Sequence, residues 1–415
     1  MQKKDVKVPF IILALIIELV FGGAGRLIVI GERSISERFI LFGFAMLYWV
    51  YSGFNGNKVK VYKTKYGIHV MSVFIMLIIA IVVGIINNND FSNIISNFQG
   101  YSYLLLFFPF VISIKTKDQA LKIFNLFINC AVILSVIIII LNFLMKIGFS
   151  YTTLANYMEK YGLGMISYTG ETPRVFFKGS ILVMVAFGNQ LLIVINNYHE
   201  NMIRSFMKLA ILGLATIFSY TMGIWLGAFV VVLLIIVLQW KNLKGSTIFV
   251  GFIVLLSIIY FEKDTVLKVL QLRTKSTDIS GIVKSQQIKV LFNLWRTHPF
   301  VGAGLGKEIT IATVTGNRVM SQFESSWLQL LMNTGIFGLF IYGSLIVRMC
   351  IDGFLKLQNS DSSIRILGLS VFLSGISLSI VNWFNPALNN PIGIGYLVIN
   401  LTILNVIRKE KFSFK

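Results

Sequence analysis

Apolar runs of about twenty residues recur along the chain, and they constrain its fold more than any other feature. The 415 residues are 56% hydrophobic and only 13% charged. Because a helix needs about 20 mostly apolar residues to cross a bilayer, this pattern predicts a polytopic membrane protein rather than a large soluble domain. The first run is long and lacks a small-residue cleavage site, so we expect it to be retained rather than removed as a signal peptide.

The runs predict an all-α fold of about twelve transmembrane helices, forming a single membrane domain over residues 1–415. The candidate spans are 8–30, 37–54, 66–86, 99–114, 119–147, 175–196, 205–221, 223–240, 245–261, 323–349, 364–384 and 391–407. Three of them are short, and 205–221 is separated from 223–240 by a single residue. Counts of ten or eleven spans therefore stay open.

The distribution of lysine and arginine predicts the orientation of these helices. If the amino terminus is cytoplasmic, the loops that become cytoplasmic are the basic ones, as the positive-inside rule requires. They contain Lys58, Lys60, Lys63, Lys65, Lys115, Lys117, Lys122, Arg204, Lys208, Lys241, Lys244, Arg348, Lys356, Arg365, Arg408, Lys409, Lys411 and Lys415. Both termini are predicted to be cytoplasmic. Orientation also accounts for the net charge of +20, so nucleic acid is not expected as a partner.

This orientation places two long segments on the outer face: an outer loop over 149–174 and a large outer loop over 262–322. Within the larger one, residues 282–296 predict an amphipathic helix that lies along the membrane interface. Its apolar face is formed by Ile288, Leu291, Phe292 and Trp295. Charged residues in these two segments are not explained by orientation, so they are the functional candidates.

A glycine-rich stretch from His298 to Gly306 follows this helix. Pro299 is expected to end the helix, and the glycines allow backbone conformations that other residues rarely adopt. The stretch predicts either a tight structural turn or a turn whose backbone N–H groups bind an anion. The sequence leaves both interpretations open.

The most prominent acidic candidate is Glu324, where the chain returns to apolar character after the large loop. We expect it in the first turn of a membrane helix, where the positive end of the helix dipole favours a carboxylate. A plain helix-terminal charge is the alternative. A second acid, Glu18, lies within the first predicted span, and we expect it to pair with Arg26.

The basic candidates lie in the outer segments. Arg174 and Lys178 are spaced to share one face of a helix, where they could hold a diphosphate or extend towards the membrane interface. Lys284 and Arg296, on the predicted interfacial helix, are expected to meet either lipid headgroups or a diphosphate. His298 is a candidate proton relay, with a capping or packing role as the alternative.

The metal-binding residue types are few and dispersed. The chain has two cysteines, Cys130 and Cys350, and three histidines that are far apart in the sequence. Neither a disulfide framework nor a metal site is predicted from this spacing, and no cofactor is expected.

The order of the motifs resembles the bacterial O-antigen ligase and polymerase superfamily, and most closely its Wzy-type polymerases of O-antigen or capsular repeat units. The resemblance is carried by Arg174, Gly281–Gln287, His298–Gly306, Phe323–Leu331 and Thr334–Leu339. It implies a GT-C-like, metal-independent glycosyltransferase at the outer face of the bacterial cytoplasmic (inner) membrane. The implied donor and acceptor are both undecaprenyl-diphosphate-linked oligosaccharides. Membrane lipids are further implied partners. Whether a chain-length regulator also binds stays open.

The resemblance also implies roles for the candidates. Such a transfer needs a base for the acceptor hydroxyl and cations for the departing diphosphate. The base would be Glu324, with His298 as a secondary catalytic residue. The cations would be Arg174, Lys178, Lys284, Arg296 and Arg273.

The chain departs from the family pattern in two places. Lys284 stands where related proteins often have arginine, and lysine does not make the bidentate phosphate contact of arginine. Related proteins often have a second arginine near the position of Thr221–Gly223, where this chain has none. The role of that cation would pass to Lys178, Arg273 or Arg296. Many ligases carry histidine where this chain has Glu324, which favours a polymerase. A ligase and a flippase or transporter of lipid-linked sugars are the alternative functions.

Overall fold

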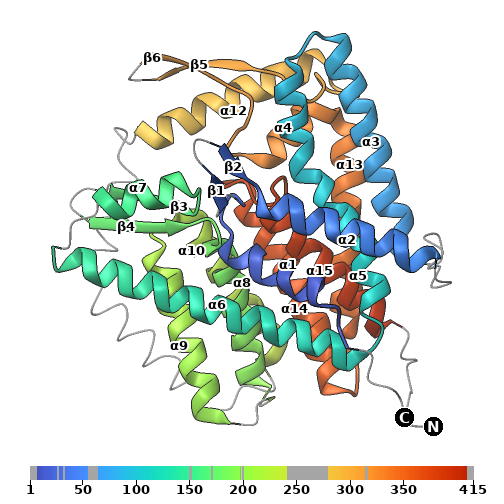
Figure 1. Ribbon diagram of the computed structural model, residues 1–415, viewed down its shortest axis with the longest axis vertical. Coiled ribbons are helices and arrows are strands. Elements are labelled where there is room, and N and C mark those ends of the chain that lie inside the picture. The colour runs from blue at the N-terminus through green and yellow to red at the C-terminus, as the bar shows by residue number, and fades with distance from the viewer. Residues whose placement is uncertain are drawn as a thin grey trace.

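The computed structural model describes residues 7–25, 28–30, 33–54, 64–148, 152–169, 172–196, 198, 201–240, 279–313 and 316–408. The described part is a helical bundle with three short antiparallel hairpins (Figure 1). Its longer helices are α1 (Phe10–Phe21), α2 (Glu37–Phe54), α3 (Gly67–Ile86), α4 (Phe91–Ser102), α5 (Phe107–Ser113), α6 (Lys117–Lys146), α7 (Thr152–Lys160), α8 (Ser180–Ile195), α9 (Met202–Phe218), α10 (Met222–Gln239), α12 (Ile279–Thr297), α13 (Ser326–Phe354), α14 (Ser362–Val381) and α15 (Pro391–Ile407). The 3-10 helix η2 (Tyr103–Leu106) joins α4 to α5, and η4 (Leu355–Gln358) follows α13.

Among the described residues, six helical segments are long and apolar enough to cross a membrane. They are Gly67–Ile86, Phe91–Ser113, Lys117–Lys146, Met222–Gln239, Ser326–Gln358 and Ser362–Val381, and shorter apolar helices are Phe10–Phe21, Ser180–Ile195 and Pro391–Ile407. These helices support a multi-pass membrane protein. The count of twelve spans and the cytoplasmic location of both termini stay predictions. The predicted span 245–261 lies outside the described residues.

The hairpins correct the prediction of an all-α fold. They pair β1 (Ile28–Ile30) with β2 (Arg33–Ile35), β3 (Gly164–Thr169) with β4 (Thr172–Phe177), and β5 (Ile309–Thr313) with β6 (Gly316–Met320). Two of them shorten predicted spans: α1 ends at Phe21 rather than near residue 30, and α8 begins at Ser180 because β4 occupies the residues before it. Short two-stranded ribbons leave only a weak periodic signal beside long apolar runs.

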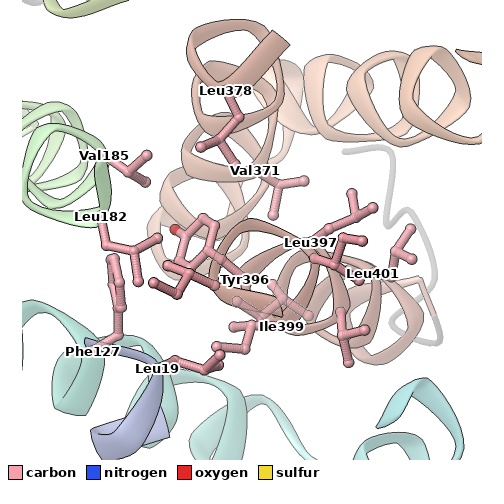
Figure 2. Packing of buried hydrophobic residues seen from close by; sticks show 14 of the residues in the cluster. Leu19, Phe127, Leu182, Val185, Val371, Leu378, Tyr396, Leu397, Ile399 and Leu401 are labelled. Atoms are coloured by element: carbon pink, nitrogen blue, oxygen red, sulfur yellow. The ribbon is translucent and has the colours of Figure 1, made fainter. Parts of the chain in front are cut away.

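Helix α15 forms the centre of the bundle, and its residues from Ile392 to Ile407 are all buried. Around Tyr396, side chains from α1, α6, α8 and α14 meet (Figure 2). The Tyr396 ring lies 4.5 Å from that of Phe127, and its hydroxyl accepts a 3.0 Å hydrogen bond from Asn189. Burial of a helix on all sides matches its mostly apolar composition, in which Asn400, Thr402 and Asn405 are the polar side chains.

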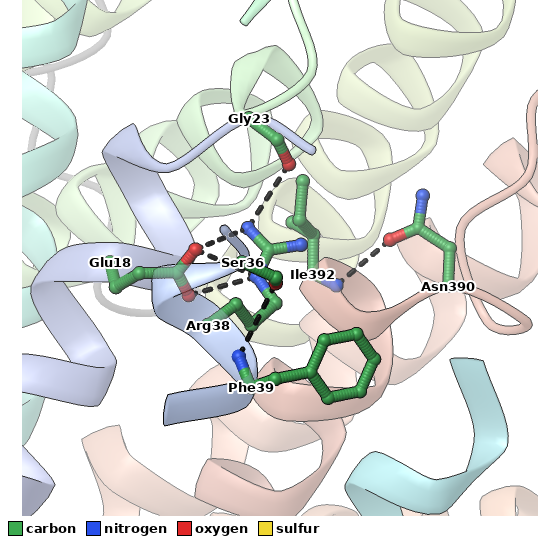
Figure 3. Close-up of polar contacts among 7 residues, drawn as sticks. All are labelled: Glu18, Gly23, Ser36, Arg38, Phe39, Asn390 and Ile392. Atoms are coloured by element: carbon green, nitrogen blue, oxygen red, sulfur yellow. Dashed lines mark hydrogen bonds and ion pairs between the residues drawn. The ribbon is translucent and has the colours of Figure 1, made fainter. Parts of the chain in front are cut away.

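A buried ion pair joins the first two helices. Arg38 Nε donates to both carboxylate oxygens of Glu18, at 2.7 and 2.9 Å, and Arg38 Nη2 donates to the Gly23 carbonyl at 3.0 Å (Figure 3). Both side chains are about 5% exposed. Among the described residues, the partner of Glu18 is therefore Arg38. The expected partner, Arg26, lies outside the described residues.

The glycine-rich stretch is a structural turn that docks into a break in α13. At Gly335 the backbone leaves helical geometry, with φ 66° and ψ −168°. The carbonyls of Met332 and Asn333 accept hydrogen bonds from the N–H groups of the turn, and the N–H groups beyond the break donate back to it. These bonds are Ala303 N to Met332 O, Gly304 N to Asn333 O, Ile336 N to Pro299 O and Phe337 N to Phe300 O.

This docking decides between the two interpretations of the turn. Three of its N–H groups, at Ala303, Gly304 and Leu305, already donate to backbone carbonyls of α13 and α3. Irregular backbone is tolerated in a membrane helix only where its polar groups are satisfied by protein or water. The turn therefore completes α13, and these three N–H groups are not free to bind an anion.

Helix α12 and the hairpin β5–β6 lie together at one end of the molecule, and the far end of α9 lies at the other (Figure 1). Several predicted cytoplasmic residues also meet one another. Asp352 binds Lys65 and, at 3.3 Å, Arg348, while Lys117 binds Asp361 at 2.6 Å. Loops assigned to one side by their charge are thus neighbours in the fold.

Candidate functional site

Glu324 and Lys284 form an ion pair at the end of the bundle where α12 lies. Lys284 Nζ is 2.7 Å from Glu324 Oε2, and the two side chains are 33% and 43% exposed. Lys284 lies on α12 and is half-buried. Glu324 directly precedes Ser325, the N-cap of α13. Glu324 thus lies just outside the helix instead of in its first turn. A carboxylate and an ammonium that are both accessible can be separated by an incoming anion.

The segment that carries Glu324 is fixed by side-chain amides. Gln287, one turn after Lys284 on α12, accepts the N–H of Glu324 at 3.3 Å. Gln329 accepts the N–H of Phe323 at 3.2 Å and donates to Ser321 O at the same distance. It also donates to Asn97 on α4 at 2.8 Å. Because these amides bind backbone groups of Glu324 itself and of the residues just before it, they position its carboxylate.

Arg174 reaches the start of α10. It lies in β4, where it pairs in register with Ser167. Its Nε donates to Ser219 O at 3.0 Å and its Nη2 donates to Thr221 Oγ1 at 2.8 Å. The guanidinium therefore stands beside Thr221, the N-cap of α10.

The expected helical pairing of Arg174 with Lys178 is wrong, because Arg174 belongs to a strand. Lys178 lies in the turn between β4 and α8, and its N–H donates to Leu163 O. A spacing of four residues brings side chains together on a helix but not across a strand and a turn.

The loop between α14 and α15 connects the surroundings of Arg174 with those of Glu324. A Cβ placed on Gly223, at the start of α10, would lie 2.9 Å from Phe384 Cβ and 3.2 Å from Asn385 Oδ1. On the other side of this loop, Lys284 Nζ approaches Phe384 O at 3.4 Å. Arg174 and the Glu324–Lys284 pair therefore flank the same short loop.

Two of the remaining predicted residues, Arg296 and His298, are not gathered with Glu324. Arg296 and His298 lie at the opposite end of α12 from Lys284, roughly 20 Å along the helix at 1.5 Å per residue. Both are exposed: Arg296 stacks on Phe292 and His298 Nδ1 is 2.9 Å from Thr297 Oγ1. Arg273 lies outside the described residues.

Helix α12 differs in detail from the faces predicted for it. Leu291 is buried, and Gln287 is buried with it. Ile288 and Phe292, expected on the same apolar face, are exposed next to Lys289. Exposed apolar and basic side chains on one helix are typical of a helix that lies at a membrane interface.

Sequence reasoning missed the residues that hold the site in place. Gln287, Gln329 and Asn382 act through hydrogen bonds between their side-chain amides and backbone groups of nearby loops, and such contacts leave no periodic pattern. The sequence feature that could have revealed Gln329 is a polar residue within an otherwise apolar helix. Among the described residues, no three His, Cys, Asp or Glu side chains are grouped so that they could hold a metal ion.

The described fold and site define a multi-pass membrane protein with a cation–carboxylate pair at one end of its bundle. Residues 207–343 match the protein family described as O-antigen ligase. The matched region spans less than half of the chain and includes Lys284, Arg296, His298 and Glu324, whereas Arg174 precedes it. No curated protein matches the chain. The match supports placement in the O-antigen ligase and polymerase superfamily, whose members are glycosyltransferase-like enzymes that act on lipid-linked sugars.

Proposed function

We propose that the protein is a polymerase of lipid-linked oligosaccharide repeat units at the outer face of the bacterial cytoplasmic membrane. The observation that carries this proposal is the accessible Glu324–Lys284 pair, whose two members both lie within the family match. In the proposed reaction a growing chain leaves its polyprenyl diphosphate and joins a hydroxyl of the next lipid-linked unit. Nothing beyond two lipid-linked substrates is required.

The pair supplies the general base and the cation that this transfer needs. Glu324 takes the proton of the acceptor hydroxyl as that oxygen attacks the anomeric carbon of the donor sugar. The bond between this carbon and the diphosphate oxygen breaks, and the diphosphate leaves with its electron pair. Lys284 stabilises the charge that develops on the leaving group.

The ion pair also suggests an order of events. While Lys284 Nζ contacts Glu324 Oε2 at 2.7 Å, this oxygen is not free to accept a hydrogen bond from the acceptor hydroxyl. A donor diphosphate carries more negative charge than a carboxylate and competes for the ammonium. Donor binding would therefore free Glu324 for the acceptor.

The test uses purified protein in detergent and lipid-linked units extracted from cells that lack the protein. We expect a ladder of products without a nucleotide sugar, and its loss in Glu324→Gln. Glu308→Gln is the matched control, since Glu308 is an exposed carboxylate near the same end that binds Asn93 at 2.7 Å. Normal ladders from Glu324→Gln would contradict the assignment of the base.

A ligase of the same superfamily is the second candidate, and the description of the matched family favours it. The two functions differ in where the product resides. A polymer that remains on the polyprenyl diphosphate is released by mild acid, whereas a ligated glycan has moved to another acceptor and resists this treatment. A flippase or transporter predicts no joined product in detergent, where no second compartment exists.

A further inference from the structure

Two adjacent aromatic side chains are exposed in the loop between α14 and α15. Trp383 is 52% exposed and Phe384 is 37% exposed. The loop itself is well fixed: Asn382 Oδ1 accepts the N–H groups of Ala387 at 3.1 Å and Leu388 at 2.8 Å. The N–H groups of Trp383 and Phe384 donate to carbonyls of the last turn of α14. A rigid scaffold thus presents a large aromatic surface to the outside.

Among the residues that the structure describes, the indole N–H of Trp383 lacks the hydrogen bond that most of the other tryptophans make. Trp225, Trp295 and Trp327 each donate Nε1–H to a backbone carbonyl, at 3.1, 3.0 and 2.9 Å. Within the described part of the chain, Trp383 Nε1 has no such partner. Trp383 therefore offers both an aromatic face and a donor to a molecule that binds here.

The backbone of this loop contacts Lys284 and the start of the helix that follows Glu324. The N–H of Ser326, two residues after Glu324, donates to Asn382 O at 3.0 Å. Lys284 Nζ approaches Phe384 O at 3.4 Å. Trp383 lies between these two carbonyls in the chain, so its position is tied to Glu324 from one side and to Lys284 from the other.

The chemistry of a sugar fits this arrangement. A hydroxyl that loses its proton to Glu324 must approach the carboxylate within about 3 Å, so the ring that carries it rests against the neighbours of Glu324. A sugar ring has faces of C–H groups and an edge of hydroxyls. An aromatic ring packs against the apolar face, and a free indole N–H binds a hydroxyl at the edge.

We propose that Trp383, together with Phe384, forms a sugar-binding subsite that holds the acceptor unit against Glu324. This inference rests on the proposed function for the identity of the sugar as an acceptor. The alternative role of an exposed tryptophan in a membrane protein is to anchor the helices at the lipid interface. Both roles use an amphipathic ring, and they differ in that only the subsite binds a sugar.

The experiment compares Trp383→Leu with Trp383→Tyr in the purified, full-length protein. Steady-state joining of extracted lipid-linked units is measured against their concentration. Loss of the aromatic face is expected to raise KM about tenfold or more, with kcat changed less than about threefold. Trp383→Tyr keeps a ring and a donor and is expected to stay within about threefold of the wild type in KM.

Trp240→Leu is the matched control, because Trp240 is 69% exposed and lies at the other end of α10 from Gly223. It should leave KM unchanged. An unchanged KM in Trp383→Leu, or an equal rise in Trp383→Leu and Trp383→Tyr, would overturn the subsite.

A binding measurement separates failure of the subsite from failure of the proposed function. Oligosaccharide released from the extracted units by mild acid is observed by saturation-transfer NMR with wild-type protein and with Trp383→Leu. Signal that is present in the wild type and lost in the variant supports the subsite even if no joining is detected. Absence of signal in the wild type, or equal signal in both proteins, contradicts it.

Discussion

For Lys284, the contribution of its charge to catalysis can be separated clearly from its contribution to stability. An ion pair as exposed as Lys284–Glu324 contributes only about 0–1 kcal/mol to stability, whereas removal of a group that stabilises a leaving anion costs about 10²–10³ in rate. We therefore expect Lys284→Met to reduce kcat about a hundredfold or more while thermal unfolding in detergent stays close to the wild type.

Two further variants test whether the charge itself matters. Lys284→Arg keeps the cation and adds a planar contact for phosphate, so it should retain about a tenth of the activity or more. Lys289→Met removes an exposed lysine from the same helix and should leave kcat unchanged. A large fall of kcat in Lys289→Met would show that general attraction of α12 to lipid, rather than a specific contact of Lys284, governs activity.

At the same scale, the sequence predicted the charged members of the candidate site better than its other residues. Lys284 and Glu324 stood out because charges on a predicted outer segment need a reason other than orientation. Trp383 and Gln329 did not stand out, since exposed aromatics and helix-embedded amides are compatible with many roles. Their significance depends on which distant backbone groups they contact, and only the fold supplies that information.

At the scale of elements, apolar runs predicted most helices closely, as for 66–86, which is observed as Gly67–Ile86. Hydropathy works here because a spanning segment must satisfy its own backbone hydrogen bonds as a helix. It failed at β4 and at the break in α13. The break depends on Gly335 meeting the turn at residues 299–304, and no local pattern within 323–349 indicates that contact.

Gly335→Ala tests the docked turn. The new Cβ would lie 2.1 Å from Phe300 O, and φ 66° is rarely adopted by alanine, so the turn must move away from α13. We expect a loss of several kcal/mol in stability against SDS or heat, because buried carbonyls and N–H groups on both segments lose their partners.

Gly343→Ala is the comparison within the same helix. A Cβ on Gly343 meets no atom within 4 Å, so this change should be neutral or stabilising by about 0.5–1 kcal/mol. Equal stability of the two variants would mean that α13 does not need the turn.

At the scale of the whole molecule, the Glu18–Arg38 pair joins the first two helices beside the start of α15 (Figure 3). Removing one partner leaves a buried charge, so Glu18→Gln and Arg38→Gln should each cost about 3–5 kcal/mol of unfolding free energy. The double variant should cost clearly less than the sum. A double-mutant cycle of unfolding in detergent measures this difference, and strictly additive effects would show that the two charges act independently.

The exchange of hydrogen bonds between the glycine turn and the broken helix has a consequence for how such a chain can change over time. The turn supplies donors and acceptors that α13 lacks at Gly335, and α13 supplies those that the turn lacks. Neither segment is complete without the other, so a substitution in one is tolerated only with a compensating change in its partner. We therefore expect the two stretches, some thirty residues apart in the sequence, to change together.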